Sequence, residues 1–78
     1  MNMKSPAQKT KSVVIIEDQT AIRELVTEML EGKGKFKVIG STADGAEGVE
    51  LALRLKPDIL ILDILLPGIT GIEVLHRL

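Results

Sequence analysis

The sequence contains no cysteine, tryptophan or tyrosine, and Phe36 is its single aromatic residue. Without cysteine the chain has no disulfide framework and no thiolate chemistry, which fits a reducing compartment, with the cytoplasm as the default. The formal net charge of −1 provides no electrostatic footprint for nucleic acid or for an anionic membrane. No apolar run approaches the ~20 residues that a membrane-spanning helix needs. These absences argue against nucleic acid and membrane as partners of this chain.

The composition is that of one small globular domain with an aliphatic core. Of its 78 residues, 45% are hydrophobic and 27% are charged, which is typical of soluble folded domains rather than disordered chains. Residues 1–11 carry three lysines but no apolar segment, so we expect a flexible leader that is neither a signal peptide nor a membrane anchor. The folded domain is predicted over residues 12–78.

Three short apolar runs have the composition of strands. Val13–Ile16 is a continuous β-branched run, as in a strand buried on both faces of a parallel sheet. Residues 36–40 alternate in part, as in an edge strand with Lys37 toward solvent. The third run occupies residues 58–63, where four apolar residues stand between two aspartates.

The intervening segments carry helix signals. Between Thr20 and Gly32 the apolar residues recur at helical spacing, which predicts a buried stripe with Met29 in the core. The stripe consists of Ile22, Leu25, Val26, Met29 and Leu30, with Arg23, Glu24, Thr27 and Glu28 outward. Capping boxes predict the starts of two further helices, at Asp44–Glu47 and Thr70–Glu73. The second helix is expected to end at Lys56 before Pro57, and its extra leucines, Leu51 and Leu55, have no evident packing role.

Strands that alternate with helices through short connections predict a parallel sheet, whose ligands bind at the C-terminal ends of the strands. If strand 13–16 lies between the other two, Glu17 and Asp18 meet Asp63 at that edge. Three like charges repel unless a cation neutralises them, and an oxygen-rich site with few protein ligands suits Mg²⁺. Alternatively, Asp18 caps the first helix and Asp63 is an ordinary strand-end residue. The joint occurrence of three acids at one edge favours the metal site.

The motifs around these acids resemble the receiver domain of bacterial two-component response regulators. They are the segment Val13–Asp18 and the frame D-x-x-x-P-x-x-x-G, formed by Asp63, Pro67 and Gly71. The resemblance extends from about Lys11 to Leu78. It implies a flavodoxin-like α/β fold with a parallel sheet of strand order 2-1-3, of which this chain would supply three of the family's five β-α units. The threonine or serine and the lysine that contact the phosphoryl group in the family follow later strands, which this chain lacks.

The resemblance also implies roles for individual residues. Asp63 would be the phosphoacceptor, and Asp18 and Asp63 would bind Mg²⁺ directly. The backbone carbonyl of Leu65 would be a further ligand, and Glu17, where many relatives carry aspartate, would act on the metal through water. The phosphoryl group would come from a sensor histidine kinase or a phosphotransfer protein. Such a domain is regulatory and catalyses only its own phosphorylation and dephosphorylation.

Two other functions stay open. Without a fourth strand, the chain would be an inactive fragment that self-associates through an open sheet edge as a homo-oligomer. A Mg²⁺-dependent phosphohydrolase with Asp63 as nucleophile is least favoured, because Leu65 occupies the place of its usual second carboxylate. His76 is expected to be solvated and is assigned no role.

Overall fold

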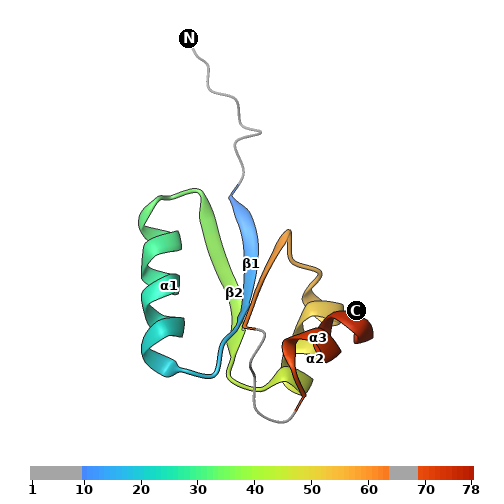
Figure 1. The fold of residues 1–78 in the computed structure, drawn as a ribbon. Helices are drawn as coiled ribbons and strands as arrows, with labels where there is room; N and C mark the ends of the chain where they lie inside the picture. The colour runs from blue at the N-terminus through green and yellow to red at the C-terminus, as the bar shows by residue number, and fades with distance from the viewer. Residues whose placement is uncertain (1–9, 64–68) are drawn as a thin grey trace.

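The computed structural model describes residues 10–63 and 69–78. Its strands form one parallel sheet in which β1 (Lys11–Ile16) lies between β2 (Phe36–Thr42) and β3 (Ile59–Leu62). Figure 1 shows α1 (Thr20–Gly32) on one side of the sheet, with α2 (Gly45–Leu55) and α3 (Gly71–Arg77) together on the other. The predicted flavodoxin-like α/β fold with strand order 2-1-3 is confirmed. Among the described helices, none combines the length and the apolar character that crossing a bilayer requires.

The central strand β1 supplies most of the core. Its four apolar residues, Val13 to Ile16, are completely buried because helices cover both faces of the strand. Val14 and Ile16 pack against Val49 of α2 and Val74 of α3. Full burial of such a side chain contributes about 1.5–3 kcal/mol relative to its exposure. β1 is therefore firmly held up to Ile16, the residue directly before the first acid of the predicted site.

A register shift in β2 explains the two leucines that the sequence left without a role. Between Val13 and Val14 the pairing with β2 skips one residue, so that Val14 lies beside Gly40. A β-carbon on Gly40 would lie 3.3 Å from Cδ1 of Leu55 and 3.5 Å from Cδ1 of Leu51. Both leucines of α2 thus pack over a strand residue that has no side chain, and the wide apolar stripe of α2 covers the sheet.

The face that α1 turns toward the sheet differs from the expected one. Ile22, Leu25 and Met29 of the apolar stripe are 41%, 52% and 59% exposed, so the prediction that Met29 belongs to the core is wrong. The half-buried face includes Val26 and Leu30, which form the other flank of the stripe. It also includes Arg23 and Thr27, which were expected to point outward. The sheet covers one flank of the stripe, and in the described part of the chain no element packs on the other.

The helix starts agree with the capping signals in the sequence. The side chains of Asp44 and Thr70 accept hydrogen bonds from the backbone N–H three residues on, at 2.8 and 3.1 Å. α2 ends one residue earlier than predicted, because Lys56 adopts the left-handed conformation with φ 48° and ψ 60°. β1 begins at Lys11, the last residue of the expected leader, whose N–H donates to the carbonyl of Lys35 at 2.9 Å. The division into leader and domain stays a prediction.

Candidate functional site

Three carboxylates meet at the C-terminal edge of the sheet. Glu17 and Asp18 directly follow β1, and Asp63 directly follows the neighbouring strand β3. The N–H of Asp63 donates to the carbonyl of Ile16 at 2.9 Å, so the backbone at Asp63 continues the hydrogen bonding between the two strands. One carboxylate oxygen of each acid lies within 4.8 Å of those of the other two. The structure therefore brings together the three side chains that the sequence predicted to meet.

The spacing of these carboxylates is compatible with Mg²⁺. This ion binds oxygen ligands at about 2.0–2.1 Å in octahedral geometry, so two of its direct ligands lie at most about 4.2 Å apart. The three carboxylate oxygens lie within 4.8 Å of one another, which is close to this separation. The individual roles expected for Asp18, Asp63 and Glu17 stay a prediction. Carboxylate oxygens are also the hard donors that Mg²⁺ prefers.

Hydrogen bonds from backbone N–H groups hold the connection from Glu17 to Gln19. The N–H of Glu17 donates to the carbonyl of Thr42 at 3.0 Å, and the N–H of Gln19 donates to Oε2 of Glu17 at 3.1 Å. The N-cap of α1 is Gln19, which makes no side-chain capping hydrogen bond. Asp18 stands before that position, so the capping role considered for Asp18 is not observed.

Arg23 is a contributor to the site that the sequence analysis missed. Its Nη1 donates to the carbonyl of Glu17 at 2.6 Å, and its Nη2 donates to Oγ1 of Thr20 at 3.3 Å. The helical pattern placed Arg23 on the outward face of α1, but the observed rotation of the helix leaves it half-buried beside the connection. A positive residue in the first turn of a helix is unfavourable for the helix dipole, and this was the available signal of a specific role.

Thr42 is a second residue that the sequence analysis missed. It is 6% exposed, and its hydroxyl accepts a hydrogen bond from the N–H of Asp44 at 3.1 Å and donates one to the carboxylate of Glu47. In a capping box the Glu47 carboxylate would reach the Asp44 N–H directly, whereas here the threonine hydroxyl stands between them. Thr42 thereby joins the start of α2 to the strand end that also binds the N–H of Glu17.

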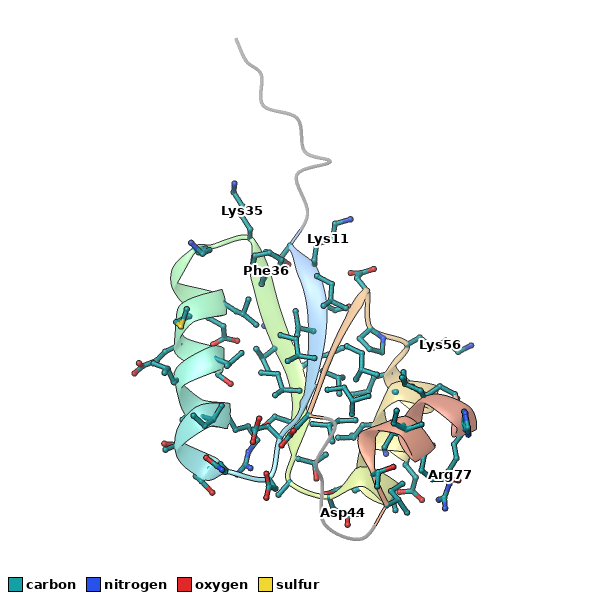
Figure 2. All side chains as sticks on the ribbon, viewed as in Figure 1. Lys11, Lys35, Phe36, Asp44, Lys56 and Arg77 are labelled. Carbon is teal, nitrogen blue, oxygen red and sulfur yellow. The ribbon has the colours of Figure 1, made fainter. Side chains whose placement is uncertain are left out.

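Lysines lie at the end of the sheet opposite the acidic cluster. Figure 2 shows Lys11 and Lys35 at the end where the strands begin and Asp44 at the end where the strands finish. The acidic cluster lies at the same end as Asp44, so these lysines do not neutralise it. The three carboxylates outnumber the guanidinium of Arg23 beside them, so this edge favours a cation over an anion.

Part of the predicted site lies outside the described residues. This applies to Leu65, whose carbonyl was expected to bind the metal, and to Pro67 of the sequence motif. Gly71, the last residue of that motif, is buried at the start of α3. The role of Leu65 stays a prediction.

A parallel α/β sheet of order 2-1-3, with acids at the ends of its first and third strands, has the architecture of a receiver domain. The family model of the response regulator receiver domain matches residues 13–78. The chain therefore belongs to the response regulator receiver domain family, as its sequence motifs predicted. Receiver domains are regulatory parts of two-component systems.

Individual relatives are consistent with this membership. The chain is 36% identical over 66 residues to the transcriptional regulatory protein LiaR of Bacillus subtilis, which covers 85% of the chain and 31% of LiaR. It is 32% identical over 71 residues to the nitrate/nitrite response regulator protein NarL of Escherichia coli, which covers 91% of the chain and 33% of NarL. The crystal structure of the response regulator domain of Thermotoga maritima CheB matches with a TM-score of 0.85 at 33% identity, covering 88% of the chain and 52% of that domain. The chain thus spans about a third of these regulators and about half of the solved domain.

Proposed function

We propose that the chain is the phosphoacceptor part of a two-component signalling protein, in which Asp63 receives a phosphoryl group with the assistance of Mg²⁺. The observation that carries this proposal is the meeting of Glu17, Asp18 and Asp63 within 4.8 Å at the ligand-binding edge of a receiver-family sheet. An acidic cluster alone would indicate no particular chemistry. In this family and at this edge, the cluster supplies both a nucleophile and a place for a cation.

Each acid has its own task in the transfer. A carboxylate oxygen of Asp63 attacks phosphorus and forms a P–O bond while the P–N bond to a phosphohistidine breaks, and the imidazole leaves with the electron pair and gains a proton. The phosphohistidine belongs to a sensor histidine kinase or a phosphotransfer protein. Asp18 and Asp63 would hold Mg²⁺ directly, Glu17 would act on it through water, and the carbonyl of Leu65 would be its backbone ligand. When bound there, Mg²⁺ would supply positive charge that stabilises the transferring phosphoryl group.

The backbone of Asp63 is well suited to this nucleophilic role. Its N–H is bonded to the buried strand β1, so the α-carbon that carries the carboxylate is fixed relative to Glu17 and Asp18. A nucleophile held in place avoids part of the entropic cost of aligning the reacting groups.

The proposal predicts that the chain takes up one phosphoryl group from a small phosphodonor such as acetyl phosphate in the presence of Mg²⁺. Intact-mass spectrometry measures the uptake, and Asp63→Asn is expected to abolish it because an amide oxygen is a far weaker nucleophile than a carboxylate. Asp44→Asn is the matched control: asparagine is also a good N-cap, so α2 keeps its start and labelling should persist. Labelling that survives Asp63→Asn would overturn the assignment.

A second candidate function is self-association without chemistry, and the position of β3 favours it. β3 stands at one end of the strand order β2-β1-β3, and all four of its residues are only partly buried. An edge strand presents N–H and C=O groups that can pair with another chain. The partner would be a second copy of this chain, and amide exchange in β3 as a function of concentration tests the pairing.

A further inference from the structure

We propose that Arg23 is a positioning residue of the acidic site. Its guanidinium holds the connection between β1 and α1 in the conformation that directs Glu17 and Asp18 toward Asp63. The inference rests on the proposed function, because it concerns the affinity of these acids for Mg²⁺.

The geometry of Arg23 joins the two ends of the connection. The side chain reaches back from the first turn of α1, and one planar group donates to the Glu17 carbonyl at 2.6 Å and to the Thr20 hydroxyl at 3.3 Å. The backbone N–H of Arg23 donates to the carbonyl of Gln19 at 2.9 Å, which is the first helical bond of α1 and does not depend on the side chain. The guanidinium therefore ties the residue before Asp18 to the first residue of α1. The bond to Glu17 is charge-assisted and partly buried, which makes it the stronger of the two side-chain bonds.

Holding the carbonyl of Glu17 restricts the carboxylate of Asp18. The peptide unit between these two residues is planar, so the direction of the Glu17 carbonyl fixes the orientation of the whole unit and the start of Asp18. The N-cap of α1, Gln19, contributes no side-chain capping bond that would order the same segment. Arginine suits this task because its rigid fork loses little freedom for each hydrogen bond that it forms.

The charge of Arg23 and its hydrogen bonds act on a bound cation in opposite directions. A guanidinium near the acids repels Mg²⁺, so loss of its charge alone would strengthen binding. Loss of its hydrogen bonds releases the connection, which weakens binding because the ligands must be ordered again when the ion binds. The sign of the change in affinity therefore distinguishes a positioning residue from one that only balances charge.

The test is a calorimetric titration of the 78-residue chain with Mg²⁺ alone at constant ionic strength. Arg23→Ala is expected to weaken binding about ten-fold, the lower end of the effect typical of residues that orient metal ligands. Arg23→Lys keeps the charge and one donor but cannot bind both ends of the connection, so it should recover part of the loss. Arg54→Ala is the control. It changes the net charge equally, and Arg54 lies in the last turn of α2. Figure 2 shows Lys56, two residues further on, far from Asp44, which marks the end of the sheet where the acids lie.

A second measurement reports the connection without metal. The N–H of Gln19 is bonded to Oε2 of Glu17, so its amide resonance is expected to shift in Arg23→Ala and to stay in place in Arg54→Ala. Circular dichroism establishes whether each variant is folded. If Arg23→Ala does not fold, the wild type is compared with Arg23→Lys instead.

The outcomes separate this inference from the function on which it rests. A wild-type chain that does not bind Mg²⁺ overturns both. If the wild type binds and Arg23→Ala binds equally well or more tightly, the positioning role is overturned and the proposed function stands. Weaker binding in Arg23→Ala, with partial recovery in Arg23→Lys, supports the inference.

Discussion

Asp58 joins the start of β3 to β1 at the end of the sheet opposite the acidic site. Its Oδ2 accepts hydrogen bonds from the N–H and the hydroxyl of Ser12 at 2.8 and 3.1 Å, and its own N–H donates to the Ser12 hydroxyl at 2.9 Å. The bond from the Ser12 backbone, then that from its hydroxyl, lowers the pKa of Asp58 below its usual 3.8. The positive charge of Lys11 acts in the same direction, and desolvation opposes the shift. Ionised Asp58 therefore stabilises the folded state relative to the unfolded state.

The lowered pKa of Asp58 gives a defined pH dependence. Its contribution to stability is fully present above the usual pKa of 3.8 and is lost as the pH falls through the lower pKa of the folded state. We expect Asp58→Asn to unfold at a lower urea concentration at neutral pH, and to lose less stability than the wild type between about pH 5 and pH 3. Urea midpoints followed by far-UV circular dichroism measure both. Ser12→Ala keeps the backbone donor, so its urea midpoints should fall between those of the wild type and Asp58→Asn. Parallel curves of midpoint against pH for the wild type and Asp58→Asn would contradict the prediction.

The helix α2 approaches the strand β1 closely at Gly48. A β-carbon at this position would lie 2.7 Å from Cγ1 and 3.2 Å from Cγ2 of Ile16, which is completely buried and has no room to move away. Gly48→Ala is expected to lower the free energy of unfolding by about 1–3 kcal/mol through overpacking. This cost exceeds the gain of roughly 0.5–1 kcal/mol that alanine brings to a helix interior. Urea unfolding followed by circular dichroism measures the change.

Gly32 at the end of α1 is the matched control for Gly48. A β-carbon there would have no other atom within 4 Å, so Gly32→Ala should leave stability unchanged or slightly raised. Equal effects of the two substitutions would show that α2 does not pack against β1 as closely as the structure describes.

Local signals were sufficient for most elements and for the meeting of the acids. Asp44 and Thr70 revealed helix starts because a capping side chain and the N–H that donates to it lie within one turn. The place of Asp63 followed from the topology, since parallel neighbours end at the same edge. Met29 and Arg23 were misplaced because the rotation of α1 about its axis depends on which flank of its apolar stripe the sheet covers. That choice is made by tertiary packing and leaves no mark in the helical spacing.

In the described part of the chain, the helices on both sides of the sheet have exposed apolar side chains. The exposed residues on α1 are Ile22, Leu25 and Met29. On α3 they are Ile72 and Leu75, and Leu78 directly follows that helix. These helices lie on opposite sides of the sheet (Figure 1), and β3 is the strand at one of its ends. A second copy paired with β3 would extend the sheet and bring additional helices over both faces. Exposed apolar surface on this scale favours association.

The direction of the amides in β3 makes this association testable residue by residue. The N–H of Asp63 points toward β1, and because peptide groups alternate along a strand, the N–H of Ile61 does too, while those of Leu60 and Leu62 point toward the open edge. If a second copy pairs there, hydrogen exchange at Leu60 and Leu62 should slow as the protein concentration rises, since their amides gain acceptors. Ile61 and Asp63 should be protected at every concentration and serve as internal controls. Exchange at Leu60 and Leu62 that is independent of concentration, in a chain that sediments as a monomer, would contradict pairing through β3.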